Sequence, residues 1–208
     1  MENLENYLVD KENQIIKLLD PPFEKSYLEP GYIKSYLPGV RENGGQYTHA
    51  AIWVIIAQVL LGFGEKATEY FTMINPIEHT KTKTMVNKYK VEPYVIPGDV
   101  YGVGNLAGRG GWTWYTGSSS WYYKAGLEYI LGLKIENQYL KIEPNIPSTW
   151  KEYSIRYKFG KTIYNIKIKN PNEKTNGVSK FMFNGNEITE KQIKLVNDEK
   201  LKDIEIEM

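Results

Sequence analysis

The sequence predicts an α+β fold, with helices in the first part of the chain and a small antiparallel β-domain in the second. Up to about residue 134, apolar residues recur at helical spacing. Beyond that point they alternate with polar residues, as they do in half-buried strands, and Gly or Asn-Gly turns separate the runs. We therefore expect two domains, residues 1–134 and residues 135–208.

Composition narrows the class of protein. The 208 residues carry a formal net charge of +1, so the chain has no electrostatic reason to bind nucleic acid. There is no cysteine, which excludes disulfides and thiolate metal sites. The N-terminus is polar and acidic, and the longest apolar stretch, residues 50–61, is too short to span a bilayer. We expect a cytoplasmic protein with no membrane segment.

Four helices are expected in the first domain. They cover residues 8–19, 48–61, 65–74 and 120–131. Thr48 is a suitable N-cap for the second helix, and Gly62 is its stop signal. The short Gly-Phe-Gly connection at 62–64 makes the second and third helices an antiparallel αα-hairpin, the unit of helical bundles and α/α barrels.

The strands of the second domain are expected to be short. They cover residues 139–142, 153–157, 162–168, 181–183, 193–196 and 204–206. Two long glycine-rich stretches, 21–47 and 76–117, are expected to be irregular loops. Compact domains seldom carry such long loops unless these build a site.

The first candidate site is the run Arg41–His49, which reads Arg-Glu-Asn-Gly-Gly-Gln-Tyr-Thr-His. It leads into the expected helix start at Thr48, where unpaired N–H groups and the helix dipole favour an anion. His49 would lie in the first turn. A histidine that is hydrogen-bonded for structural reasons is the alternative. The other histidine, His79, is expected at the surface.

The second candidate is the run Gly108–Ser120, which reads Gly-Arg-Gly-Gly-Trp-Thr-Trp-Tyr-Thr-Gly-Ser-Ser-Ser. Its glycines let backbone amides approach a ligand, and its hydroxyls can donate to oxyanions. It lacks the ending of a phosphate-binding Walker loop, and no strand precedes it as a dinucleotide fingerprint requires. A tight loop whose aromatic rings fill the core is the alternative.

The third candidate is the carboxylate pair Glu92 and Asp99. Glycosidic chemistry needs a carboxyl group that donates a proton to a leaving oxygen, and either residue could do so in principle. A buried Glu paired with Arg41 or Arg109 is the alternative.

Three runs in matching order and spacing carry a family resemblance. They are Pro38–Ala50, Tyr89–Tyr94 and Gly108–Trp121. Over about residues 10–160 the chain resembles the C-terminal part of glycoside hydrolase family 94, formerly glycosyltransferase family 36, and within it the β-1,2-glucan branch. The resemblance implies that the helices are the last part of an (α/α)6 barrel and that the strands form the β-domain after it.

The resemblance also implies an activity. In this family inorganic phosphate attacks the anomeric carbon of a β-linked gluco-oligosaccharide and inverts it, while an Asp protonates the glycosidic oxygen. No cofactor or metal is expected, with phosphate as co-substrate. The phosphate contacts carried over from the family's motifs are His49, Thr116 and Gly117. The implied sugar-binding residues are Tyr36, Arg41, Glu92, Trp112 and Trp114, with the two tryptophans near the acceptor sugar.

The family's general-acid Asp lies well before the Asn-Gly-Gly run, so we expect it upstream of Met1 and expect no catalytic acid in this chain. Asp10 and Asp20 do not match its context. The helices should then expose an apolar face and pair with an upstream barrel half or a second copy. The expected function is a phosphorylase fragment that makes α-glucose 1-phosphate only when complemented. The alternatives are the C-terminal part of a cyclic β-1,2-glucan synthase and an inactive carbohydrate-binding fragment.

Overall fold

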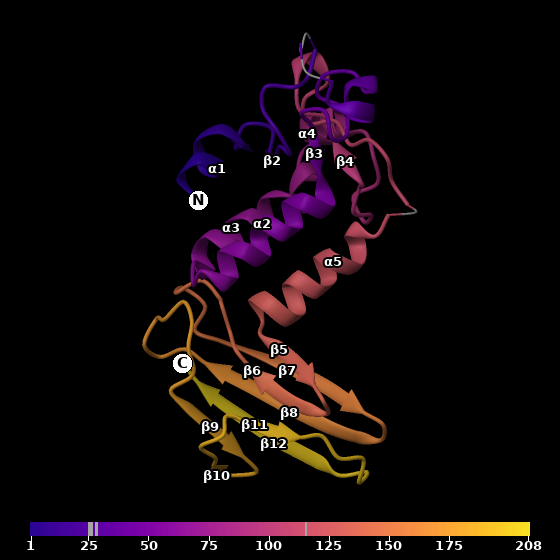
Figure 1. Ribbon diagram of the computed structural model, residues 1–208. Coiled ribbons are helices and arrows are strands. Elements are labelled where there is room, and N and C mark those ends of the chain that lie inside the picture. Colours follow the sequence, from indigo (N-terminus) through magenta and orange to yellow (C-terminus); the bar gives the residue numbers. More distant parts are fainter. Residues whose placement is uncertain (25–26, 28, 115) are drawn as a thin grey trace. The chain divides into compact units, whose positions relative to one another are not determined.

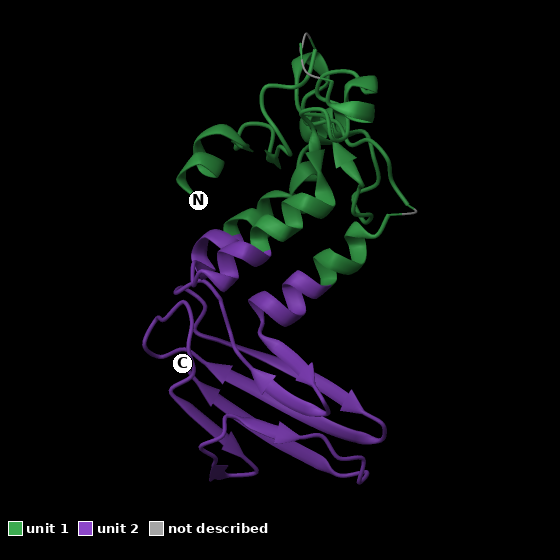
Figure 2. Ribbon diagram, in the orientation of Figure 1, with its two compact units in different colours: residues 1–55, 69–123 green, residues 56–68, 124–208 purple. Residues whose placement is uncertain are grey.

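The computed structural model describes residues 1–24, 27, 29–114 and 116–208. Its contacts divide it into two compact units, residues 1–55 with 69–123 and residues 56–68 with 124–208 (Figure 2). The two domains expected from the sequence, residues 1–134 and 135–208, do not coincide with these units. That domain boundary stays a prediction. Tyr115, in the second candidate run, lies outside the described residues.

The helices are labelled in Figure 1 where there is room. They are α1 (Glu2–Tyr7), α2 (Thr48–Leu60), α3 (Gly64–Met73), α4 (Lys83–Tyr89) and α5 (Ser118–Lys124), the 3₁₀ turns η1 (Gly31–Ser35), η2 (Glu78–Thr80) and η3 (Gly104–Leu106), and the π-helix η4 (Ala125–Ile130). Helices α2 and α3 confirm the second and third expected helices. The fourth is also confirmed, although it widens from α5 into η4.

The helix expected over residues 8–19 is wrong. Helix α1 ends at Tyr7, and strands β1 (Val9–Asp10) and β2 (Ile15–Ile16) form a hairpin instead. The Asp10 carboxylate accepts hydrogen bonds from the backbone and side-chain amides of Asn13, at 3.0 and 2.7 Å. A short polar side chain that bonds the nearby backbone competes with a helix and favours a turn. The β-branched pair Ile15–Ile16 is then buried as strand.

Helix α4 falls within a stretch expected to be irregular. The Thr82 hydroxyl caps it by accepting a hydrogen bond from the Met85 N–H at 3.2 Å, and Lys90 ends it in a left-handed conformation. Thr82 was therefore an N-cap signal that the expectation of an irregular loop over the whole of residues 76–117 missed. Tyr89, at the end of α4, packs with Ile15 and Val100 in a buried cluster that anchors the loops of the first unit.

The strands of the second unit form two sheets. The order in the first is β10 (Asn186–Glu187), β9 (Lys180–Phe183), β12 (Leu201–Glu207), β8 (Thr162–Lys169) and β7 (Glu152–Phe159), and in the second β11 (Gln192–Lys194), β6 (Tyr139–Ile142) and β5 (Leu133–Glu136). All pairings are antiparallel except that of β12 with β8, which is parallel. The expected strands are confirmed, but an entirely antiparallel domain is wrong.

Each sheet buries one face. On β8, Tyr164, Ile166 and Ile168 are buried and alternate with more exposed residues, as the period-two pattern predicts. The Tyr164 hydroxyl accepts a hydrogen bond from the Val196 N–H at 2.8 Å and donates to the Val196 carbonyl at 3.1 Å. This pair of bonds ties β8 to the segment that follows β11. The α+β class is thus confirmed, while the barrel stays a prediction.

Helix α2 is apolar on nearly every side, yet it is not buried on every side. Its sequence, THAAIWVIIAQVL, contains no charged residue. Ile52 and Ile55 are buried, whereas Trp53 is 54% and Leu60 is 70% exposed. A helix that is hydrophobic all round normally lies inside a larger structure. Among the described helices, none combines the length and apolar character needed to cross a membrane.

Candidate functional site

A small sheet brings the two glycine-rich stretches of the first unit together. Strand β3 (Gln46–Tyr47) pairs with β4 (Asp99–Val100), which places Tyr47 opposite Asp99 (Figure 1). On the other side of β4, the Gly98 N–H donates to the Trp112 carbonyl at 2.6 Å and the Gly111 N–H donates to the Asp99 carbonyl at 2.9 Å. The first and second candidate runs therefore flank one strand.

Asn43 fixes the shape of the first run. It is fully buried, and its side-chain oxygen accepts a hydrogen bond from the Phe23 N–H at 2.7 Å. Its side-chain amide donates to the carbonyls of Phe23 and Tyr36, at 2.9 and 2.8 Å. Because the side chain satisfies three partly buried backbone groups, it holds the backbone of residues 23 and 36 beside Arg41.

Arg41 and two aromatic rings form the polar and stacking surface of the site. The Arg41 guanidinium carbon lies 5.3 Å from the Tyr36 ring centroid and 5.1 Å from that of Trp112. The guanidinium also donates a hydrogen bond to the Tyr36 hydroxyl at 3.3 Å. This bond is the main reason that the Arg41 pKa is raised above its ordinary value. Arg41 therefore remains a cation held between two rings.

Two carboxylates lie beside this surface. Arg41, Glu42, Tyr47, Gly98, Asp99 and Trp112 line a cavity of about 250 Å³. One oxygen of Glu42 (Oε2) and one of Asp99 (Oδ2) are buried and have no hydrogen-bond partner among the described residues. Burial raises the pKa of Asp99, and hydrogen bonds from the N–H groups of Trp112 and Arg41 oppose that rise.

His49 lies among aromatic rings in the first turn of α2. Its ring centroid is 4.9 Å from that of Trp53, 5.7 Å from Trp121 and 6.3 Å from Tyr47, with the Tyr47 and His49 rings nearly parallel. Trp121 belongs to α5, so this contact joins the start of α2 to the first turns of α5. His49 is half-buried.

Thr116 and Gly117 lie on the approach to α5. The Ser118 N–H donates to the Thr116 hydroxyl at 3.2 Å, and the two hydroxyls also bond each other. A Cβ atom at Gly98 would lie 3.3 Å from Thr116 Cγ2, and the Gly98 carbonyl accepts the Thr48 N–H at 3.0 Å. Gly98 thus connects the start of α2 to Thr116. The structure brings His49, Thr116 and Gly117 to one region of the first unit.

Glu92 and Trp114 pair with each other instead. The Trp114 indole N–H donates to the Glu92 carboxylate at 3.1 Å. The backbone N–H of Glu92, and then this indole, hold the pKa of the Glu92 carboxyl below its usual value. Neither residue lines the cavity beside Arg41. The expected sugar-binding residues therefore fall into two groups, one of Tyr36, Arg41 and Trp112 and the other of Glu92 and Trp114.

Several neighbours of the site were not singled out from the sequence. Glu42 lies in the first candidate run, but nothing in the pattern gave it a role. The structure shows three further neighbours of His49, because it places the rings of Tyr47, Trp53 and Trp121 beside the imidazole. For Trp53 the signal was its position one helical turn after His49.

The surface position expected for His79 is wrong. Its side chain is only 5% exposed, and its ring stacks on the buried Tyr89 with 4.8 Å between centroids. Burial lowers the pKa of His79 to about 4. A short 3₁₀ turn places it inward, which a lone histidine in a polar stretch does not reveal.

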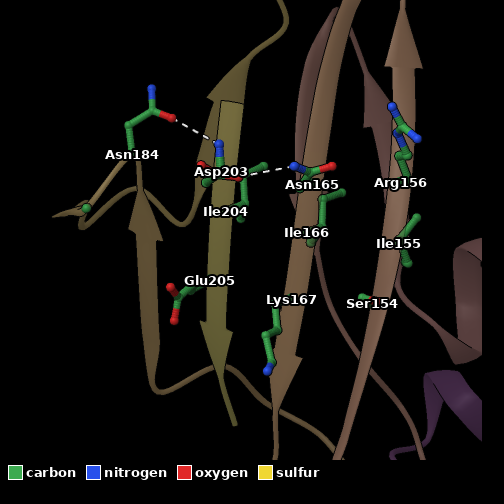
Figure 3. A pocket seen from close by; sticks show the side chains of 11 residues that line it. Ser154, Ile155, Arg156, Asn165, Ile166, Lys167, Asn184, Asp203, Ile204 and Glu205 are labelled. Atoms are coloured by element: carbon green, nitrogen blue, oxygen red, sulfur yellow. Dashed lines mark hydrogen bonds between the residues drawn. The ribbon is translucent and has the colours of Figure 1, made fainter. Parts of the chain in front are cut away.

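A larger hollow, of about 650 Å³, lies on the polar face of the five-stranded sheet in the second unit (Figure 3). Several of its polar side chains pair with lining or neighbouring residues. The Asn165 amide donates to Asp203 at 3.3 Å, and Lys167 pairs with Glu152 at 3.0 Å. We regard it as an open, ion-paired sheet face. Among the described residues there is also no cluster of three or more His, Asp or Glu side chains that could hold a metal ion.

Comparison with known proteins assigns the chain to a family. Residues 1–132, which include the whole site described above, match the family model "Glycosyl hydrolase 94 superfamily, catalytic domain". The chain belongs to this superfamily. The match confirms the resemblance inferred from the motifs of residues 38–50, 89–94 and 108–121.

The chain is also similar to individual proteins, including the three that follow. The chain is 50% identical, over 77% of its length, to 6% of the cyclic beta-(1,2)-glucan synthase NdvB of Rhizobium meliloti (strain 1021). It is 29% identical over 79% of its length to the N,N'-diacetylchitobiose phosphorylase of Vibrio furnissii, and 27% identical over 91% to the solabiose phosphorylase of Paenibacillus borealis. It spans 20% and 24% of those two phosphorylases.

Proposed function

We propose that the chain supplies the phosphate-binding part and one sugar-binding part of an inverting glycoside phosphorylase. The reaction is the cleavage of a β-glucosidic bond by inorganic phosphate, which gives α-glucose 1-phosphate. The observation that carries this proposal is that Gly98 links the start of α2 to the loop of Thr116 and Gly117, which is distant from His49 in sequence. Two relatives of the chain are named as phosphorylases, which supports the reaction class.

Phosphate would bind where the first turn of α2 offers backbone N–H groups and a partial positive charge. The imidazole of His49 and the hydroxyl of Thr116 are hydrogen-bond donors, and Gly117 leaves its surroundings free of side-chain atoms. A phosphate oxygen held by these groups would attack the anomeric carbon from the face opposite the leaving oxygen, which inverts the centre. The sugar would lie against Arg41 and Trp112.

The leaving oxygen needs a proton, and we propose that neither of the two candidate acids, Glu92 and Asp99, supplies it. Glu92 has a lowered pKa, so it holds its proton poorly near neutral pH. Asp99 has a raised pKa, but its side chain is only 2% exposed, and its unpaired oxygen Oδ2 is buried. The acid would come from another segment, an upstream barrel half or a second copy. The exposed Trp53 of the apolar helix α2 offers that segment a surface.

One alternative function has an observation in its favour. The 50% identity with a stretch of a cyclic beta-(1,2)-glucan synthase suggests that the chain acts as the C-terminal part of such an enzyme. The same phosphate and sugar groups would then act on the length of a β-1,2-glucan. A catalytically inactive carbohydrate-binding fragment is the remaining possibility, and it requires sugar binding without phosphate binding.

Phosphorolysis tests the proposal. The chain would be incubated with inorganic phosphate and β-1,2- or β-1,4-linked gluco-oligosaccharides, and α-glucose 1-phosphate would be measured. We expect no product from the chain alone, and product when a polypeptide carrying the preceding helices of a superfamily member is added. The variant His49→Asn should abolish that product. Product from the chain alone would contradict the missing acid, and full activity of His49→Asn would contradict the phosphate site.

A further inference from the structure

Asp99 is a buried carboxylate, and its burial lowers the stability of the fold. Its side chain is only 2% exposed, and one of its oxygens, Oδ2, has no hydrogen-bond partner among the described residues. Removing a carboxylate from water without full compensation destabilises a fold. Neither the expected phosphate contacts nor the expected sugar contacts include this residue, so its presence calls for a separate explanation.

The backbone around Asp99 is built to receive the carboxylate. Asp99 Oδ1 accepts a hydrogen bond from the Trp112 N–H at 2.8 Å. A Cβ atom at Gly111 would lie 2.6 Å from both carboxylate oxygens, so only glycine fits at that position. The carboxylate therefore fixes the backbone from Gly111 to Trp112, and with it the direction in which the Trp112 side chain leaves the chain.

Trp112 in turn positions Arg41. The Arg41 guanidinium carbon is 5.1 Å from the Trp112 ring centroid, and Arg41 has a left-handed backbone, with φ of +49°. A non-glycine residue adopts that conformation only where its surroundings compensate for the strain. The negative charge of Asp99 is one of the influences that favour the charged form of Arg41. Asp99 thus acts on both members of the Arg41–Trp112 pair.

We propose that Asp99 is a positioning residue that holds Arg41 against Trp112 and so builds the surface that receives one sugar ring. The identity of the ligand rests on the function proposed above, whereas the positioning does not. The cavity beside the pair, of about 250 Å³, is below the roughly 300–1,000 Å³ of sites for drug-sized ligands, which suits a single ring. An aromatic face with a guanidinium beside it offers stacking and hydrogen bonds to hydroxyls. Asp99 lines this cavity, but its Oδ2 atom is buried, so we place its action on Trp112 and Arg41 and not on the sugar.

A purely structural role makes different predictions for the variant Asp99→Asn. Asparagine keeps an oxygen that can accept the Trp112 N–H, so the loop should fold, but it removes the charge beside Arg41. If Asp99 were only a loop anchor, this isosteric change would leave Arg41 and sugar binding unaltered. A positioning role predicts that folding survives while the Arg41–Trp112 contact loosens.

The first experiment needs no ligand. In the free chain, the side-chain protons of Arg41 should show upfield NMR shifts from the Trp112 ring, because the guanidinium lies over it. We expect Asp99→Asn to lose most of that shift while the melting temperature stays within a few degrees of wild type. The matched control is Asp10→Asn, because Asp10 also accepts a backbone N–H but lies in the β1–β2 turn. An unchanged Arg41 shift in folded Asp99→Asn would overturn the proposal.

The second experiment measures sugar binding by titrating the chain with D-glucose and a β-linked gluco-disaccharide, following tryptophan fluorescence. We expect Asp99→Asn to raise the Kd about tenfold, the effect of losing one charge-assisted contact. The Kd for inorganic phosphate should not change. If the wild type binds neither sugar nor phosphate, the proposed function fails, and the NMR shift still decides the positioning role. If it binds sugar and Asp99→Asn binds equally well, the positioning role fails and the proposed function stands.

Discussion

Replacing His79 by phenylalanine should remove an acid-sensitive element of stability. His79 is buried against Tyr89, and its Nε2 atom has no hydrogen-bond partner among the described residues. Burial is the main cause of its pKa of about 4, and the nearby charge of Lys88 lowers that pKa further. Hydrogen bonds with the backbone of Gln14 and Met73, and to a smaller extent the charge of Glu78, oppose this lowering. A phenylalanine ring keeps the stacking on Tyr89 but cannot take a proton.

The magnitude follows from the difference between two pKa values. Histidine in the unfolded chain has a pKa of about 6.5, and each pKa unit corresponds to about 1.4 kcal/mol. Because the folded-state pKa is the lower one, the unfolded state binds the proton first as the pH falls. The contribution of His79 is therefore complete above about pH 6.5 and is lost progressively down to about pH 4. Near pH 5 the loss should be about 2 kcal/mol relative to pH 7.5.

Urea unfolding of the wild type and of His79→Phe, at about pH 7.5 and pH 5, measures this loss. The wild type should lose about 2 kcal/mol more than the variant on acidification. Other titrating groups contribute to both proteins and cancel in the comparison. His49→Asn, which leaves the buried histidine in place, should keep the wild-type difference. Equal pH dependence of the wild type and His79→Phe would refute the assignment of His79 as a buried neutral base.

Three substitutions test contacts within each of the two units, with stability measured by urea unfolding. Tyr164→Phe should cost about 1–3 kcal/mol, because the N–H and carbonyl of Val196 lose their partner, whereas Tyr157→Phe on the neighbouring strand should be nearly neutral. Asn43→Ala should cost about 2 kcal/mol, because it leaves three partly buried backbone groups without their side-chain partner. A cost near zero would mean that water replaces the side chain. Gly111→Ala should cost about 1–3 kcal/mol of stability, because its methyl group would collide with Asp99. The control Gly117→Ala should cost little, because a Cβ atom there has nothing within 4 Å. Equal costs for the two variants would contradict the close packing at Gly111.

The sequence predicted best those elements whose signal is local. Helix α2 is a continuous apolar run that begins at Thr48 and stops at Gly62, so its limits follow from capping and turn chemistry. The strands of the second unit follow from alternation alone. Alternation does not say which strand pairs with which, and so the parallel pairing of β12 with β8 could not be foreseen.

Two other predictions were wrong, the helix over residues 8–19 and the surface position of His79, and both have local causes. Residues 8–19 carry apolar residues at helical spacing, but the hydrogen bonds of Asp10 to Asn13 favour a turn, and this competition is not visible in the period of the pattern. His79 lies in a polar stretch and is buried only because a 3₁₀ turn directs it toward Tyr89. Both cases depend on short-range geometry that hydrophobic periodicity does not contain.

The candidate site was predictable as a set of motifs but not as an arrangement. The runs around His49 and Thr116 were recognised from their order and spacing. The contact of Arg41 with Trp112, and the separate pairing of Glu92 with Trp114, depend on which loops flank β4. The role of Asp99 needed the structure most of all, because a single Asp in a glycine-rich stretch carries no signal of being buried.

The central claim is that this chain holds the phosphate of a phosphorylase site, and calorimetric titration with inorganic phosphate tests it most directly. The wild type should bind phosphate with a measurable Kd. His49→Asn and Thr116→Val should each weaken binding at least about tenfold, and the control Thr113→Val should bind as the wild type does. Phosphate binding that is absent in the wild type, or that survives unchanged in folded His49→Asn and Thr116→Val, would contradict the account.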